Sequence, residues 1–162
     1  MRWYLLRHGH SPSAAAAGVA TDFDRPLSDG GREDVRKVAR LLAARGARPD
    51  LILHSPLQRA AQTALEAAAV LKPAQGLEAF PPLANEAGPE ELAAALRDRG
   101  RGCSELLIVG HQPQLGELVL VLSHAVCSLP PGGAAALEPN SDGSAVLLWS
   151  CNPADDSPPA QV

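Results

Sequence analysis

The feature that most constrains the fold is a short apolar run that ends abruptly in polar residues. Residues 3–6 (WYLL) read as a buried strand, and Arg7-His8-Gly9 follows at once. Gly9 lacks a Cβ atom, so the backbone can turn sharply there. Because open α/β sheets bind ligands at the carboxyl ends of their strands, this order predicts a cation and an imidazole at a binding edge. Arg7 offers a fork of donors suited to phosphate, and His8 can be a neutral nucleophile at physiological pH.

Two later apolar runs end in the same way. Residues 51–53 (LIL) precede His54-Ser55-Pro56 and Arg59, and residues 106–109 (LLIV) precede Gly110-His111. Helical periodicity follows each run. Ser55 suits a helix N-cap and Pro56 the first helical position, and the amino end of a helix attracts anions. Arg59, about one turn along, is expected to reach the same anion.

The remaining pattern predicts a single α/β domain over residues 1–151. Its expected architecture is a three-layer α/β/α fold, with a mainly parallel central sheet and helices on both faces. Residues 10–24 are expected to form an exposed loop over the site, and residues 152–162 a flexible tail. Three further helices are expected: one after Ser28 that stops at Gly46, one from Pro89 to Gly100, and one capped by Gln112 and started by Pro113. An edge strand is expected over 77–80 and a hairpin over 134–149.

Composition excludes several classes of protein. The 162 residues carry 14 basic and 18 acidic side chains, a formal charge of −4, and only 3% are aromatic. Nucleic-acid binding is therefore not expected. No apolar run reaches the roughly 18 residues of a membrane span. Three widely spaced cysteines favour reduced, apolar roles over disulfides. We expect a cytoplasmic protein.

The three junctions together resemble the motifs of the histidine phosphatase superfamily, the phosphoglycerate-mutase-like proteins. Arg7-His8-Gly9 resembles the defining motif. Ser55-Pro56, Arg59 and Gln62-Thr63 resemble the second, and Gly110-His111 resembles the third. The chain is short and has no large insertion between the motifs, and in this it is most similar to SixA-type protein-phosphohistidine phosphatases. The resemblance extends from about residue 2 to about residue 151.

This resemblance implies a covalent mechanism, and no metal or cofactor is expected, because arginine and imidazole already supply the positive charge. His8 would attack phosphorus and form a phosphohistidine enzyme intermediate, which water then hydrolyses. Arg7, Arg59 and His111, with Gly9, would bind the phosphoryl group, so phosphate or vanadate should bind there too. The expected substrate is phosphohistidine on a phosphotransfer domain or phosphocarrier. A small phosphomonoester and a non-catalytic phosphate-binding module are the alternatives.

Other polar residues near these motifs have less defined roles. Glu86 occupies a loop where many members of the family carry a general acid, but its spacing is unusual. If no acid is present, a phosphohistidine substrate is favoured, because imidazole leaves more easily than an alkoxide. His10 is expected at the rim of the pocket, and His54 is expected to be structural. A metal site through His8, His10 and His111 is disfavoured by the lack of carboxylate ligands and by the adjacent Arg7.

Overall fold

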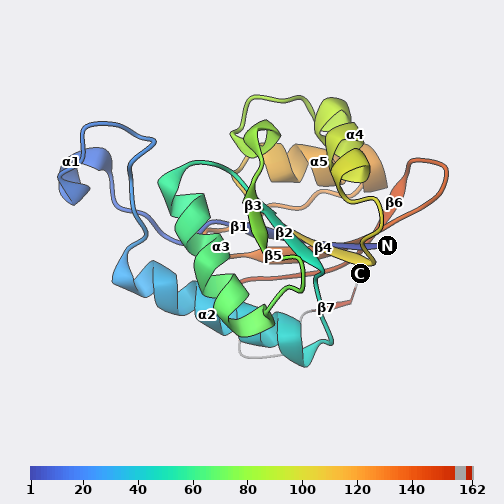
Figure 1. The fold of residues 1–162 in the computed structure, drawn as a ribbon, viewed down its shortest axis with the longest axis horizontal. Helices are drawn as coiled ribbons and strands as arrows, with labels where there is room; N and C mark the ends of the chain where they lie inside the picture. Colours follow the sequence, from blue (N-terminus) through green and yellow to red (C-terminus); the bar gives the residue numbers. More distant parts are fainter. Residues whose placement is uncertain (156–159, 162) are drawn as a thin grey trace.

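Alternating apolar side chains on the first strand bury both faces of the central sheet. The computed structural model describes residues 1–155 and 160–161. On strand β1 (Arg2–Arg7), Trp3 and Leu5 join one hydrophobic cluster, while Tyr4 and Leu6 join the other. Successive side chains of a strand point to opposite faces, so this run requires cover on both sides. The result is three layers, with one sheet between two pairs of helices (Figure 1).

The sheet is mixed, with the order β3-β2-β4-β1-β5-β6-β7. The pairings β3–β2, β2–β4 and β4–β1 are parallel, and those of β1 with β5, β5 with β6 and β6 with β7 are antiparallel. The predicted α/β/α architecture is confirmed, and the C-terminal hairpin makes the sheet mixed. The other strands are β2 (Leu51–His54), β3 (Leu77–Ala79), β4 (Glu105–Gly110), β5 (Ala134–Pro139), β6 (Ala145–Cys151) and β7 (Ala160–Gln161).

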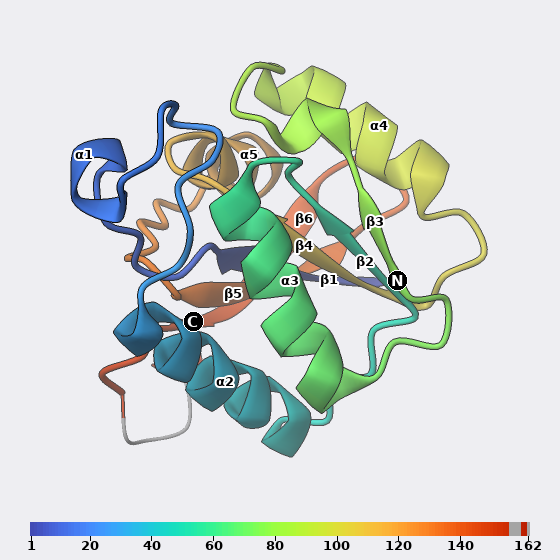
Figure 2. The same cartoon turned by 60° about the vertical axis from the view of Figure 1, so that its left-hand side comes forward.

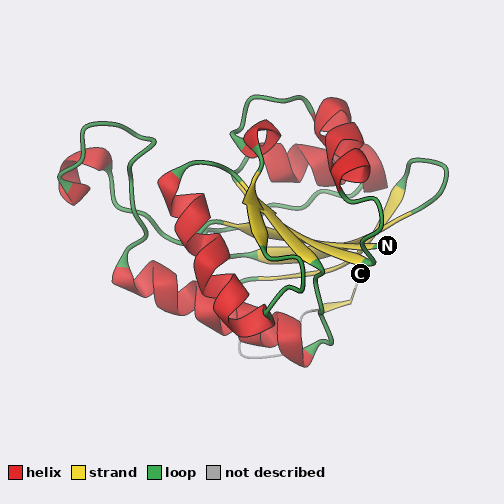
Figure 3. Ribbon diagram, in the orientation of Figure 1, coloured by secondary structure: helices red, strands yellow, loops and turns green. Residues whose placement is uncertain are grey.

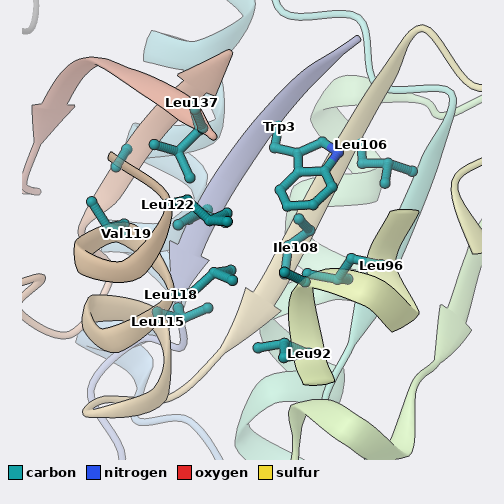
Figure 4. Packing of buried hydrophobic residues seen from close by; sticks show 14 of the residues in the cluster. Trp3, Leu92, Leu96, Leu106, Ile108, Leu115, Leu118, Val119, Leu122 and Leu137 are labelled. Atoms are coloured by element: carbon teal, nitrogen blue, oxygen red, sulfur yellow. The ribbon is translucent and has the colours of Figure 1, made fainter. Parts of the chain in front are cut away.

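Two helices cover each face of the sheet (Figures 1 and 3). Helices α2 and α3 pack over the face of Tyr4 and Leu6, and α4 and α5 pack over the face of Trp3 and Leu5. Figure 4 shows apolar side chains of α4 and α5 directed at β1 and β4. The helices are α1 (Ala14–Ala17), α2 (Asp29–Ala44), α3 (Gln58–Leu71), α4 (Pro89–Arg99) and α5 (Gln114–Ser123), with a 3-10 turn η1 (Pro81–Leu83).

The start of α3 differs from the prediction. The helix begins at Gln58, so Ser55 is not its N-cap and Pro56 is not its first residue. The Gln58 N–H instead donates to the Phe23 carbonyl (3.0 Å). Ser55 Oγ accepts from the Leu57 N–H (3.2 Å) and also meets a histidine described below. The N–H of the first helical residue is therefore bonded to a backbone carbonyl, and the predicted capping by Ser55 and Pro56 is wrong.

Smaller differences concern the exposed segments. Residues 14–17 form helix α1, capped by Ser13, within the predicted loop. Helix α5 begins at Gln114, so Pro113 is its N-cap residue instead of the predicted Gln112; the Gln112 side-chain oxygen accepts from the Gly116 N–H (2.8 Å). In the predicted tail, residues 160–161 pair with β6, which corrects the expectation for those two positions. Residues 156–159 and 162 of that tail lie outside the described residues.

Close backbone packing, rather than an unusual dihedral angle, explains Gly9. A Cβ atom there would lie 2.8 Å from the Gly31 carbonyl oxygen and 2.9 Å from a Val35 methyl group. A Cβ on Gly31 would in turn overlap the carbonyl oxygen of His10 and lie 2.9 Å from its nitrogen. Both glycines allow the first turn of α2 to pack directly against the segment after β1. This contact fixes the backbone next to His8.

Gly31→Ala should therefore destabilise the fold, because backbone atoms cannot move aside as a flexible side chain would. We expect a loss of about 1–3 kcal/mol in the free energy of unfolding, the usual scale for overpacking. Gly30→Ala is the matched control, since nothing lies within 4 Å of its added Cβ atom. Denaturant unfolding of both variants measures the effect. Equal stabilities would show that the close approach of α2 is unimportant.

Candidate active site

The three polar junctions meet in one pocket of about 410 Å³ at the carboxyl edge of the parallel strands. The segment containing α1 lies at the same edge (Figures 1 and 2). All four residues expected to form the site, Arg7, His8, Arg59 and His111, line this pocket. The complete lining is Arg7, His8, Asp22, Arg25, Leu57, Arg59, Ala84, Asn85, His111 and Gln112.

His8 is held in the form that a nucleophile requires. Its Nδ1 lies 2.7 Å from the Gly9 carbonyl oxygen. A carbonyl only accepts, so Nδ1 carries the hydrogen and Nε2 keeps its lone pair. Burial lowers the pKa of His8 to about 4, with smaller contributions from the guanidinium charges of Arg59, Arg7 and Arg25. The ring is therefore neutral at pH 7.

His111 lies beside His8, with 5.1 Å between ring centroids. Its Nε2 is 2.7 Å from Ser55 Oγ, and Ser55 is fully buried. Burial and the neighbouring His8 lower the pKa of His111 to about 3, so this ring is also neutral. Ser55 Oγ accepts from the Leu57 N–H and can donate its own hydrogen to His111 Nε2; in that arrangement the ring hydrogen of His111 lies on Nδ1. Sequence reasoning missed this role of Ser55, which it assigned to a helix cap.

The two arginines supply most of the positive charge. Burial, and then the charge of Arg59, lower the pKa of the Arg7 guanidinium, although an arginine remains protonated. Arg7 NH1 donates to the Leu129 carbonyl (3.0 Å). In the described part of the chain, Arg7 Nε and His111 Nδ1 are the buried side-chain atoms without a hydrogen-bond partner. Arg7 Nε is a donor, and His111 Nδ1 is one when Nε2 accepts from Ser55; unpaired donors of residues that line a pocket favour an anionic ligand.

Sequence reasoning also missed Asp22 and Arg25, which line the pocket from the loop between α1 and α2. An Asp22 carboxylate oxygen accepts from Arg25 NH1 (2.8 Å), and the other accepts from Arg59 NH2 (3.2 Å). The hydrogen bond from Arg25 is the largest cause that holds the pKa of Asp22 below its usual value. The available sequence signal was the Arg25-Pro26-Leu27-Ser28 segment, which leads into α2 and contains Arg25 but not Asp22.

The structure leaves several candidate residues out of the pocket lining. Glu86 is exposed, and its neighbour Asn85 lines the pocket instead. The Gly9 N–H donates to Thr63 Oγ1 (3.1 Å). His10 is exposed, and its Nδ1 is 2.8 Å from Ser28 Oγ. His54 is buried, with its Nδ1 2.8 Å from the Ser55 carbonyl oxygen.

A largely apolar groove of about 370 Å³ adjoins the pocket, and Arg7 and Gln112 line both. Its walls come from α5 and from the segment that follows it. Leu120 is 47% exposed there, and Val126 is 89% exposed. The polar pocket is therefore open toward an apolar surface.

The described residues contain no cluster of three or more histidine, cysteine or acidic side chains that could hold a metal. Among the helices in that part of the chain, none has the length and hydropathy needed to cross a membrane. All three cysteines are buried and free.

Sequence comparison identifies the family. Residues 3–83 match the histidine phosphatase superfamily (branch 1). The chain belongs to the histidine phosphatase superfamily. It is 35% identical to an uncharacterised protein of Picosynechococcus sp. over 93% of this chain and 96% of the relative. It is 28% identical to phosphohistidine phosphatase SixA of Escherichia coli over 94% of each chain.

Solved structures agree with this assignment. The protein histidine phosphatase SixA complexed with tungstate superposes with a TM-score of 0.86 at 25% identity, over 94% of this chain and 97% of the other. A putative phosphohistidine phosphatase SixA from Agrobacterium tumefaciens gives a TM-score of 0.78 at 26% identity, over 93% and 96%. Membership of the superfamily and the likeness to SixA support phosphatase activity for this chain.

The lowered histidine pKa values predict a pH dependence of stability. An unfolded histidine titrates near pH 6.5, whereas folded His8 and His111 titrate near 4 and 3. Between about pH 6.5 and 4 the unfolded chain binds more protons, so the free energy of unfolding should fall as the pH falls. The slope should be at most about 1.4 kcal/mol per pH unit for each histidine.

Denaturant unfolding across pH 4.5–7 measures this slope. Replacing both His8 and His111 by asparagine should reduce it. His10→Asn, at an exposed position, is the matched control for the substitution itself. An unchanged slope in the double variant would mean that these two rings accept protons in the folded protein as easily as in the unfolded chain.

Proposed function

We propose that this protein hydrolyses phosphohistidine on another protein, a phosphotransfer domain or a phosphocarrier. The observation that carries the proposal is the state of His8, a neutral imidazole with Nδ1 tied to Gly9 in a pocket lined by arginines. The likeness to SixA proteins over nearly the whole chain supports the same substrate.

In the proposed reaction, His8 Nε2 attacks the phosphorus atom in line with the leaving group. A bond forms between Nε2 and phosphorus as the bond from phosphorus to the substrate nitrogen breaks, and the electron pair stays on the substrate imidazole. Water then attacks the phosphorylated His8, which releases phosphate and restores the imidazole. In this proposal Arg7, Arg59 and His111 bind the phosphoryl oxygens, because positioned donors stabilise the charge of the transition state.

The pocket favours a leaving group that needs no general acid. An alkoxide requires a proton as it departs, and Glu86, the acid candidate from sequence, is not part of the lining. Asp22 does line the pocket, but its lowered pKa keeps the carboxyl ionised at neutral pH. The imidazole of a phosphohistidine leaves readily because its unperturbed pKa is near 6.5. A nitrogen–phosphorus bond therefore fits this site better than an oxygen ester.

The surroundings of the pocket favour a substrate carried by a protein. The apolar groove that shares Arg7 and Gln112 with the pocket gives a partner an adjacent surface to contact. Val126 at this groove is the most exposed of the large hydrophobic side chains in the described chain. Exposed apolar patches beside a polar site are typical of protein contact surfaces.

Turnover of a phosphohistidine-bearing phosphotransfer domain and of a phosphomonoester panel tests the proposal. The wild type should prefer the phosphohistidine domain in kcat/KM. His8→Asn should abolish turnover, and Glu86→Gln should change phosphohistidine hydrolysis by less than about twofold, because Glu86 lies outside the pocket lining. Retained folding of His8→Asn, judged by thermal unfolding, is the necessary control.

A preference for the esters, with a large loss of ester turnover in Glu86→Gln, would contradict the proposed substrate. That result would favour a small-molecule phosphomonoesterase with Glu86 as its acid. Full activity of folded His8→Asn would contradict the proposed nucleophile.

A further inference from the structure

The loop between α1 and α2 holds one carboxylate inside an otherwise cationic pocket. The Asp22 side chain is 63% exposed, whereas that of its partner Arg59 is 10% exposed. Two hydrogen bonds join these residues. Arg59 NH2 donates to the Asp22 carboxylate, and Arg59 NH1 donates to the Asp22 backbone carbonyl (2.9 Å). Arg25 binds the other carboxylate oxygen. Asp22 therefore lies at the mouth of the pocket, between two guanidinium groups.

The loop that carries Asp22 is anchored on both sides. The Phe23 carbonyl accepts from the Gln58 N–H at the start of α3 (3.0 Å). Arg25 donates to the carbonyls of Pro12 (2.8 Å) and Ser11 (3.0 Å). These bonds cross from the loop to α3 and to the segment after β1. The position of the carboxylate is thus determined by the fold and not only by its own ion pairs.

The charges of the pocket balance a phosphoryl dianion. Its lining contains three guanidinium groups, those of Arg7, Arg25 and Arg59, and the single carboxylate of Asp22. The two histidines are neutral at pH 7. The lining therefore carries a net charge of +2, which neutralises a phosphoryl group that carries two negative charges. A substrate with another anionic group near phosphorus would be left with an unbalanced charge beside Asp22.

We propose that Asp22 is a specificity-determining residue that selects the leaving group by its charge. His8 is only 9% exposed, so an in-line attack from it directs the leaving group toward the open side of the pocket, where Asp22 lies. Each Asp22 oxygen accepts one hydrogen bond from an arginine side chain and keeps a further lone pair for another donor. The carboxylate favours a cationic leaving group and disfavours an anionic one. This inference deepens the proposed function and rests on His8 as its nucleophile.

The chemistry of a phosphohistidine suits this arrangement. When its second ring nitrogen is protonated, the substrate ring is a cation, and the Asp22 carboxylate stabilises that form. As His8 Nε2 bonds to phosphorus, the bond from phosphorus to the substrate nitrogen breaks and its electron pair neutralises the ring. The imidazole leaves with its proton already on the other nitrogen, so no proton is transferred in this step.

Three substrates separate the effect of charge from that of bond type. They are a phosphohistidine-bearing phosphotransfer domain, phenyl phosphate and 4-carboxyphenyl phosphate. In Asp22→Asn, kcat/KM for the phosphohistidine domain relative to phenyl phosphate should fall about tenfold. The value for 4-carboxyphenyl phosphate relative to phenyl phosphate should rise about tenfold. This is the scale of one unit charge acting over a few ångströms at a solvent-exposed site.

Asp24→Asn is the matched control. It removes the same charge from the same loop, but Asp24 lies outside the pocket lining and accepts a hydrogen bond from Thr21 (2.8 Å). Both ratios should stay unchanged in this variant. A ratio that shifts equally in Asp24→Asn would overturn the proposal, because the effect would then be one of overall charge.

Equal loss for all three substrates in Asp22→Asn would also overturn the proposal. Asp22 would then only position Arg59, and it would not discriminate between leaving groups. Failure of the wild type to hydrolyse the phosphohistidine domain would instead contradict the proposed function. The ratio of the two esters would still report whether Asp22 selects by charge.

Discussion

Parallel backbone pairing of β1, β4 and β2 is the constraint on which the site depends. Arg7 pairs with Gly110, and His54 pairs with Val109, so three chain segments leave the sheet side by side. The ladder continues for one residue past β1 and β2. The His8 N–H donates to the Gly110 carbonyl (3.0 Å), and the Ser55 N–H donates to the Val109 carbonyl (2.9 Å). Backbone bonds thus fix His8 and Ser55 on either side of the segment that leads to His111.

Burial then determines the chemistry of this edge. Removing the two imidazoles from water among guanidinium groups makes protonation unfavourable, so both rings remain neutral. For His8 this keeps a lone pair on Nε2 at neutral pH, as a nucleophile requires. The positive charge comes from arginines, which stay protonated in such surroundings. For the same reason the free energy of unfolding should fall in acid, since both rings bind protons more readily in the unfolded chain.

The sequence predicted the meeting of Arg7, His8, Arg59 and His111 because each follows or closely follows a buried apolar run. Strand ends of a parallel sheet share one edge, so strand periodicity was sufficient to group them. The start of α3 was predicted wrongly because tertiary contacts override the local capping rules. The Gln58 N–H is bonded to the Phe23 carbonyl, and Ser55 Oγ lies against His111, whereas the capping rules assigned Ser55 to the helix end. Asp22 was not predictable, because a loop bonded to α3 positions it and no periodic pattern describes that loop.

The chemical identity of the phosphorylated enzyme atom tests the central claim most directly. The enzyme is mixed with a phosphohistidine-bearing domain, quenched in base to preserve acid-labile phosphate, and digested for mass spectrometry, with nitrogen-detected NMR to identify the phosphorylated ring atom. Phosphate is expected on Nε2 of His8, because Nδ1 is hydrogen-bonded to the Gly9 carbonyl. Phosphate on His8 Nδ1, or on His111, His54 or His10, would contradict it.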